Sequence, residues 1–225
     1  MRSTYFERCK ITDMLVNYGE NIMKREEKNQ LTRCKILDSA CKEFAAHGFE
    51  AGSVNAICQD GGVSKGIVYH YFSSKEELYL ECLTGCFDGL SSYLEKGLAV
   101  LKEDESDCIL SAYFDLRMAY FREHEIEAQL FCEAVLTPPE CLKCEIAECR
   151  QSFDELNAKT MKKILKNQPL RDDLKEEDML RVFQQFQDFL NARYRNTAKT
   201  KEGLKRHEQE CKNVLEILLY GMISR

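Results

Sequence analysis

Residues 53–75 read SVNAICQDGGVSKGIVYHYFSSK, and this stretch decides the fold. It predicts two short helices joined by a tight turn. Ser53 and Ser64 are each placed to cap a helix, because a serine oxygen accepts a hydrogen bond from the unpaired N–H groups of a first helical turn. Gly61 and Gly62 lie between these caps, where the backbone can turn sharply without a clashing side chain. The apolar residues that recur at helical spacing, and would bury one face of each helix, are Val54, Ile57, Val63, Val68 and Phe72.

The opposite face of these two helices is polar, aromatic and cationic, which is typical of a surface that reads nucleic acid. The candidate DNA-contacting residues are Ser53, Asn55, Ser64, Lys65, Gly66, Ile67, Tyr69, His70, Tyr71 and Lys75. Core packing stays an alternative for Tyr69 and Tyr71, and His70 is equally well read as an ordinary exposed histidine.

The run from Thr32 to Leu78 resembles the DNA-binding domain of the tetracycline-repressor (TetR) family. The matching positions are Ile36, Leu37, Ala40, Phe44, Gly48, Phe49, Ser53, Val54, Ile57, Gly62, Val63, Ser64, Gly66, Tyr69, Tyr71, Phe72, Lys75, Glu76 and Leu78. The resemblance implies a helix, a helix-turn-helix and the start of a long fourth helix. Gly61 departs from the family, which usually has alanine before its glycine, and we expect it to loosen the turn slightly.

The resemblance also implies that the residues around Lys65, Gly66 and Ile67 point into the major groove of DNA. Lysine can donate to guanine O6 or N7, and an isoleucine side chain can touch a thymine methyl group. Tyr69 and Lys75 are better suited to phosphate, the first as a hydroxyl donor and the second as a point charge.

Length and composition favour an all-α protein. The chain has 225 residues, 44% of them hydrophobic, and only three prolines. A chain of this length can bury about 70% of its unfolded surface, so it needs neither a metal nor a disulfide to fold. Long segments show helical rather than alternating periodicity, and no strand is predicted.

The net charge of −6 at first argues against a nucleic-acid partner. Its distribution removes the objection. Residues 24–78 contain eight Lys or Arg and eight Asp or Glu, and residues 1–23 contain three of each, so the whole excess lies after Leu78. A DNA-binding region with no net charge can still bind DNA through a few well-positioned Lys or Arg side chains, helix N-termini and hydroxyl groups. Its non-specific binding to DNA should be weak.

Twelve cysteines would suggest disulfides in a small secreted protein. Residues 1–20 lack the continuous apolar segment of a signal peptide, and the longest apolar stretch, residues 214–223, is too short to span a bilayer. We therefore expect a cytoplasmic protein that does not enter the membrane and whose cysteines serve as small buried hydrophobic residues.

Three regions are predicted: an N-terminal extension over residues 1–23, a helix-turn-helix DNA-binding domain over 24–78, and a helical effector-binding and dimerisation domain over 79–225. The extension is either a packing helix or the product of an upstream start codon, with Met23 as the alternative start. Further helices are expected over about 31–47, 75–101, 109–121, 126–136, 139–168, 174–194 and 201–223. Residues 102–107 form a charged connector.

By resemblance, the helices between residues 74 and 168 enclose a pocket for a small-molecule effector. Aromatic residues with an occasional polar group suit such a cavity. The candidates are Phe87, Tyr113, Arg117, Tyr120, Phe131 and Glu133. Ordinary core packing is the stronger interpretation of each aromatic residue, and Arg117 and Glu133 could instead pair with each other or lie in solvent.

The last two helices carry apolar stripes wider than a lone surface helix needs, and they predict a homodimer. The stripe residues are Phe183, Phe186, Leu190, Leu215, Leu218, Leu219 and Met222. Two helices from each subunit would form a four-helix bundle and hold two reading helices about 34 Å apart, which predicts a pseudo-palindromic double-stranded operator.

Other chemistry finds less support in the sequence. Cys141, Cys144 and Cys149 leave open a metal- or thiol-sensing regulator of the same fold, but paired ligands at zinc-finger separation are missing. The pair His124–Glu125 begins an H-E-x-x-H motif, but Ala128 stands where the second zinc ligand belongs. We predict no catalytic residue, no metal and no cofactor, and a repressor that a small molecule releases from DNA. A helical interaction module without DNA binding is the further alternative.

Overall fold

The computed structural model describes residues 25–100, 106–166, 175–194 and 200–222. Their regular structure is entirely helical, which confirms the predicted all-α class. The predicted extension 1–23, most of the charged connector and Pro169 lie outside the described residues.

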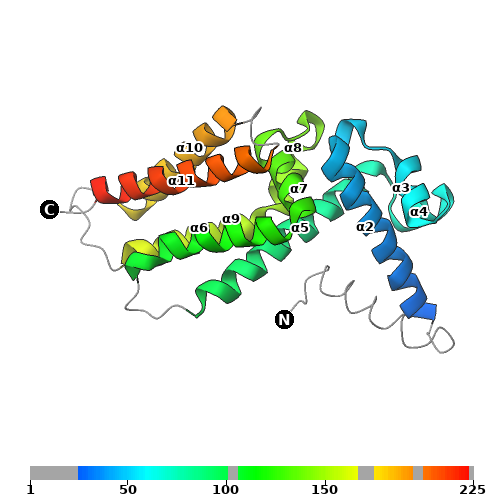
Figure 1. Cartoon of the computed structure of the whole chain (residues 1–225), viewed down its shortest axis with the longest axis horizontal. Helices are drawn as coiled ribbons and strands as arrows, with labels where there is room; N and C mark the ends of the chain where they lie inside the picture. Colours follow the sequence, from blue (N-terminus) through cyan, green and yellow to red (C-terminus); the bar gives the residue numbers. More distant parts are fainter. Residues whose placement is uncertain (1–24, 101–105, 167–174, 195–199, 223–225) are drawn as a thin grey trace.

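The first three described helices form the head of the molecule. They are α2 (Arg25–Ala51), α3 (Val54–Gly61) and α4 (Lys65–Tyr71). Ile36, Phe44, Ile57, Val68 and Phe72 are buried between them, so the apolar spacing read from the sequence does form the core of this unit. Figure 1 shows α3 and α4 at the opposite end of the molecule from α10 and α11.

Gly48 bends α2 sharply. Its φ of 76° and ψ of 174° are outside the helical region, and a single further turn follows before Ala51. The backbone N–H of Gly52 closes that turn on the carbonyl oxygen of Gly48 at 2.9 Å. The predicted helix stop at Gly48 is therefore confirmed, because a positive φ favours a residue without a Cβ atom.

Helix α5 (Lys75–Leu98) connects the head to the rest of the chain. Ser74 caps it by accepting the N–H of Glu77 at 3.1 Å, as the S-x-x-E pattern predicts. The reciprocal bond goes to the preceding residue, since the Glu77 carboxylate accepts the N–H of Ser73 at 2.6 Å. The predicted boundary between residues 78 and 79 falls inside this continuous helix.

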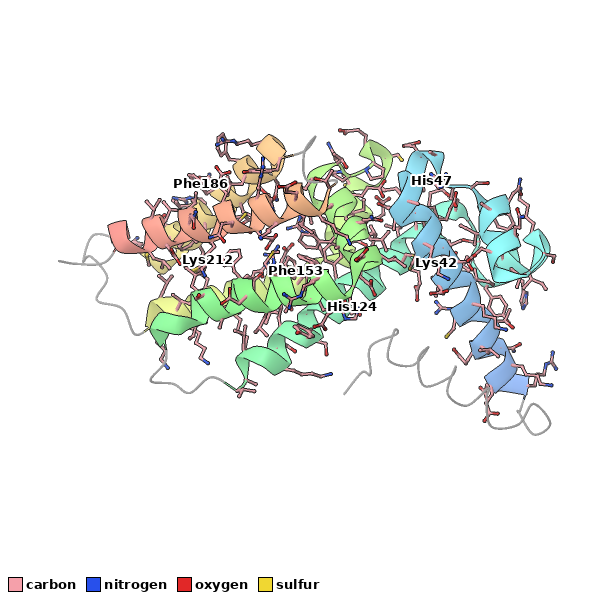
Figure 2. The ribbon with its side chains drawn as sticks, viewed as in Figure 1. Lys42, His47, His124, Phe153, Phe186 and Lys212 are labelled. Carbon is pink, nitrogen blue, oxygen red and sulfur yellow. The ribbon has the colours of Figure 1, made fainter. Side chains whose placement is uncertain are left out.

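The body of the molecule is a helical bundle packed along α5. Its elements are α6 (Ser106–Glu123), α7 (Glu125–Leu136), the 3-10 turn η2 (Glu140–Leu142), α8 (Lys143–Cys149), α9 (Gln151–Lys166), α10 (Glu176–Tyr194) and α11 (Lys201–Met222). At its centre Phe87, Phe131 and Phe153 contact one another with ring centroids 5.7–5.9 Å apart. Figure 2 shows Phe153 in the interior of this bundle.

The prediction of one helix from about residue 139 to residue 168 is wrong. The helix is interrupted at Arg150, whose φ of −90° and ψ of 0° separate α8 from α9. Ile146 of α8 and Phe153 of α9 are both buried, and both helices pack against α5. The break lets two successive segments bury their apolar residues against the same long helix.

Candidate functional site

Both helices of the helix-turn-helix begin at the serines that the sequence predicted. The Ser53 side chain accepts the N–H of Ala56, and the Ser64 side chain accepts the N–H of Ile67, each at 3.4 Å. Between them Gly62 has a φ of 62° and ends α3 in the left-handed conformation. The local chemistry of the sequence thus sets where α4 starts and which way it leaves the turn.

Helix α4 turns one face inward and leaves the other to solvent. Val68 is buried on the inner face. On the outer face Ile67 and Tyr69 are each 42% exposed, and the Lys65 ammonium lies 5.9 Å from the centre of the Tyr69 ring. Gly66 and His70 are exposed as well. The structure therefore brings five of the ten candidate DNA-contacting residues together on one short exposed surface, which we call the α4 face: Lys65, Gly66, Ile67, Tyr69 and His70.

Three other candidates lie beside the α4 face. Asn55 is exposed on α3. The Tyr71 hydroxyl donates to Asn29 on α2 at 3.2 Å, and the ring is half-buried, so part of this side chain braces the head. The Lys75 ammonium donates to the carbonyl oxygen of Glu50 at 3.2 Å and lies 4.8 Å from the centre of the Phe49 ring.

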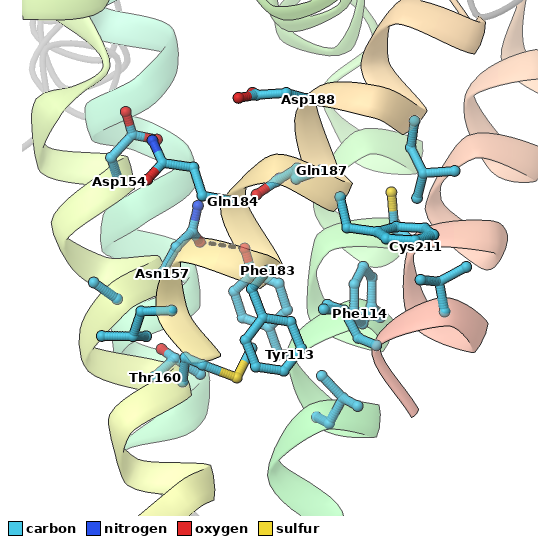
Figure 3. A pocket seen from close by; sticks show the side chains of 18 of the residues that line it. Tyr113, Phe114, Asp154, Asn157, Thr160, Phe183, Gln184, Gln187, Asp188 and Cys211 are labelled. Atoms are coloured by element: carbon cyan, nitrogen blue, oxygen red, sulfur yellow. Dashed lines mark hydrogen bonds between the residues drawn. The ribbon is translucent and has the colours of Figure 1, made fainter. Parts of the chain in front are cut away.

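A cavity of about 370 Å³ opens in the body between α6, α9, α10 and α11. Its wall is largely apolar and aromatic and includes Leu110, Tyr113, Phe114, Met161, Ile164, Phe183 and Leu215. Figure 3 shows Asp154, Gln184, Gln187 and Asp188 gathered toward one end, and the hydrogen bond from the Tyr113 hydroxyl to Asn157. An apolar wall with a few polar groups is the usual character of a small-molecule site.

The six predicted effector residues do not share one site. Tyr113 and Arg117 line the 370 Å³ cavity. Glu133 lines a second hollow, of about 850 Å³, which lies between the end of α2, α6, α7 and α11. Phe87, Phe131 and Tyr120 are buried core residues, and Tyr120 stacks on His124 with ring centroids 4.3 Å apart.

Arg117 is the centre of a buried polar network that the sequence did not reveal. Its Nη2 atom lies 2.8 Å from Glu208 Oε1, and its Nη1 donates to the Tyr113 hydroxyl at 3.2 Å. Glu208 also lies 3.2 Å from His207 Nδ1, and His207 Nε2 lies 2.9 Å from Asn191 Oδ1. The predicted alternative of an Arg117–Glu133 pair is therefore wrong, because Glu208 takes that place.

The charges in this network stabilise each other. Arg117 is 2% exposed and Glu208 is 1% exposed. Burial alone would raise the pKa of Glu208, but the Arg117 guanidinium and the hydrogen bond from His207 outweigh it, so the pKa is lowered. Nearby, burial raises the pKa of the Cys211 thiol to about 12 and keeps it in the protonated, unreactive form.

The residues predicted for the dimer interface mostly face the chain's own interior. Phe183, Leu190 and Leu219 are buried, and Phe186 and Leu215 line the cavity. Leu218 is half-buried, and the side chain of Met222 lies outside those that the structure describes. Among the described side chains of α10 and α11, the large apolar ones that are exposed are Val182, Phe189 (57% exposed) and Ile217 (70% exposed).

Cys141 and Cys144 are exposed, whereas Cys149 is half-buried and its thiol lies 3.6 Å from the carbonyl oxygen of Leu80. Among the described residues, no three His, Cys, Asp or Glu side chains are grouped so that they could hold a metal ion. Within those same residues, no helix has both the length and the apolar character to cross a membrane.

Comparison with known proteins matches both halves of the chain. The sequence profile of "Bacterial regulatory proteins, tetR family" matches residues 36–82, and that of "Tetracyclin repressor-like, C-terminal domain" matches residues 103–223. The second match alone covers more than half of the chain. The chain therefore belongs to the TetR family of bacterial regulatory proteins, as the resemblance of residues 32–78 implied.

Two individual relatives match over only part of their length. The transcriptional activator FasR of Mycolicibacterium smegmatis is 32% identical over 111 residues, which are 48% of this chain and 47% of FasR. The regulator UidR of Escherichia coli K12 is 45% identical over 49 residues, 22% of this chain and 25% of UidR. The chain thus spans half or less of these two relatives.

Solved structures share the fold over a longer stretch. The regulator FadR from Bacillus subtilis, in complex with stearoyl-CoA, superposes with a TM-score of 0.61 over 84% of this chain and 98% of that one. Its sequence identity is only 17%, so the likeness concerns the fold.

Proposed function

We propose that this protein is a transcriptional regulator that reads double-stranded DNA with the α4 face. The observation that carries the proposal is the exposure of Lys65, Ile67 and Tyr69 together on a helix whose start is held by the Ser64 cap. The family membership of residues 36–82 supports it independently. Lys65 would donate to guanine, Ile67 would contact a thymine methyl group, and Tyr69 would donate to phosphate.

The regulator would act as a homodimer that joins through α10 and α11. Support comes from the exposed Phe189 and Ile217, which leave apolar area on the outer surface of these helices. A two-fold dimer presents two copies of α4, so the operator would be pseudo-palindromic. Such a regulator would work in the cytoplasm, where it meets DNA.

A small molecule in the 370 Å³ cavity would control DNA binding. The cavity wall includes Tyr113 and Arg117, two of the predicted effector residues. The stearoyl-CoA complex of FadR is a precedent in this fold for a ligand with a long apolar acyl chain, although that ligand also carries the charged CoA group. A ligand shifts the equilibrium between two arrangements of the dimer only if it binds one of them more tightly. We propose release from DNA as the outcome, as in a repressor, and no catalytic activity.

A metal- or thiol-sensing regulator stays the second candidate, because Cys141 and Cys144 are exposed three residues apart. In that case zinc, a chelator or an oxidant would change DNA binding. Unchanged binding under all three treatments would exclude it.

The test is selection from a random library of double-stranded DNA by the purified full-length chain. Two or three rounds at moderate salt, a condition that limits non-specific binding, are expected to enrich an inverted repeat. Enrichment of no sequence above the input library would contradict the proposal and favour a helical interaction module that does not bind DNA.

A further inference from the structure

Each arginine that lines the 370 Å³ cavity already has a carboxylate partner. Arg117 is paired with Glu208 at 2.8 Å. Arg150, which also lines the cavity, lies 2.9 Å from Asp154. At the polar end Asp188 adds an exposed carboxylate that has no ion pair among the described residues. Among the described residues that line the cavity, an entering anion would meet no cation without a carboxylate partner, and it would pass the negative charge of Asp188.

One buried hydrogen-bond donor of a residue that lines the cavity nevertheless lacks an acceptor. Arg117 Nε is buried and has no hydrogen-bond partner among the residues that the structure describes. The neighbouring Tyr113 hydroxyl has no donor to spare, because its O–H donates to Asn157, and it also accepts from Arg117 Nη1. A buried donor without an acceptor is unfavourable, so a ligand that supplies an acceptor oxygen gains from satisfying it.

The charge of that acceptor decides the class of ligand. The Arg117–Glu208 pair is neutral as a unit. A carboxylate added beside it would leave an uncompensated negative charge in a buried site, which is costly. A carbonyl oxygen accepts the same N–H without bringing a charge. The rest of the wall, with Phe114, Met161 and Phe183, suits an apolar body.

We infer that the cavity binds an uncharged, largely apolar molecule that presents a carbonyl oxygen to Arg117, such as an ester, a lactone, a ketone or an amide. This inference rests on the proposed function, since it names the effector of that same cavity. Binding to Arg117 would also connect the ligand to other helices of the bundle. Arg117 on α6 is joined through Tyr113 to Asn157 on α9 and through Glu208 to α11, so a carbonyl bound to Arg117 acts on the residue that links three helices.

The test compares ligands that differ only in charge. Isothermal titration calorimetry on the full chain at pH 7 would use methyl octanoate, octanoate and octylammonium as probes, with the methyl esters of hexanoic and decanoic acid to vary length. One ester is expected to bind at least about tenfold more tightly than octanoate, whose carboxylate would be left unpaired in the cavity, and than octylammonium, because the available carboxylate, Asp188, is exposed and screened by solvent. Equal or tighter binding of either charged probe, or binding of no ester, would overturn the inference.

Two variants locate the effect. The double variant Arg117→Met/Glu208→Leu removes the pair as a unit and is expected to weaken ester binding about tenfold through loss of the donor. Asp188→Asn leaves Arg117 in place and removes a negative charge, so it is expected to reduce the difference in affinity between octanoate and the ester. Arg181→Gln, on the exposed side of α10 and outside the cavity, is the matched control and should change neither affinity. Ester binding that survives intact in a folded double variant would place the ligand elsewhere.

Calorimetry requires no DNA, so the ligand proposal and the DNA-binding proposal are tested independently. A chain that selects an operator but prefers octanoate would refute the ligand class and leave the regulator standing. A chain that prefers the ester but selects no DNA sequence would refute the DNA-binding regulator and leave the ligand class standing.

Discussion

The Glu133 side chain on α7 accepts a hydrogen bond from the backbone N–H of Phe49 on α2, with 2.7 Å between nitrogen and oxygen. This bond joins the body to the head at the bend of α2, immediately after Gly48. The fit is close, because a Cβ atom added to Gly48 would lie 2.7 Å from Glu133 Oε1. Head and body therefore meet at a point where the backbone conformation and the side-chain contact depend on each other.

Gly48→Ala should destabilise the chain. Alanine would have to adopt a φ of 76° and would press against Glu133. Residues held in such a conformation cost about 1–3 kcal/mol, and urea denaturation followed by circular dichroism would measure it. Gly66→Ala is the control, because its added Cβ meets nothing closer than Ser64 Oγ at 3.9 Å. It should be neutral or stabilising by up to about 1 kcal/mol. Equal stability of both variants would show that the bend carries no strain.

Separating Arg117 from Glu208 should cost more than removing both. Each single variant, Arg117→Met or Glu208→Leu, leaves one buried charge without its partner, and we expect a loss of about 3–5 kcal/mol in the free energy of unfolding. The double variant should recover most of that loss, because an apolar pair of similar volume replaces a neutral pair. A double-mutant cycle in urea measures the coupling. Additive losses would mean that the two side chains do not stabilise each other.

Acid should remove the contribution of Glu208. Its pKa is lowered in the folded chain by Arg117 and His207, against the raising effect of burial. A lowered folded pKa means that the stabilisation is present above the unfolded value of about 4.3 and is lost as the pH falls through the folded value. The difference in stability between the wild type and Glu208→Gln should therefore be constant from neutral pH down to the unfolded value and shrink below it. Unfolding curves at a series of pH values test this, and a difference that grows in acid would contradict it.

Phe189→Glu and Ile217→Glu should each dissociate the proposed homodimer. A charged side chain at the centre of an apolar interface leaves a buried charge unpaired. Light scattering after size exclusion should report the mass of one chain for both variants and of two chains for the wild type. Val100→Glu is the matched control, because Val100 is 81% exposed but lies just beyond the end of α5, outside α10 and α11. If the wild type itself is a monomer, the proposed interface is wrong.

Local chemistry is the part of this structure that the sequence predicted well. The caps at Ser53, Ser64 and Ser74 and the bend at Gly48 each depend on residues within one or two turns. The break at Arg150 had no such signal, because no glycine or proline occurs in residues 140–166. It follows instead from how α8 and α9 pack on α5.

Contacts between residues far apart in the chain could not be predicted from the sequence. Arg117 and Glu208 are 91 residues apart. Glu208 occupies a position in the buried stripe that also contains Leu204 and Cys211, and this was the available signal: a carboxylate inside an apolar stripe needs a buried partner. In the same way, the stripes of α10 and α11 correctly indicated burial at Phe183 and Leu190, but periodicity does not tell whether the covering surface belongs to the same chain or to a second copy.

The most direct test of the central proposal is fluorescence anisotropy of the full-length protein on DNA from upstream of its own gene, against shuffled DNA, over a series of salt concentrations. Lys65→Ala and Tyr69→Phe would be measured beside Lys35→Ala, an exposed lysine on α2 that serves as a charge control. We predict saturable binding that prefers the upstream DNA, that weakens as salt rises, and that falls about tenfold in both α4 variants while the control is close to wild type. Equal binding to both DNAs, or α4 variants that bind as well as the wild type, would contradict the assignment of the α4 face as the DNA-reading surface.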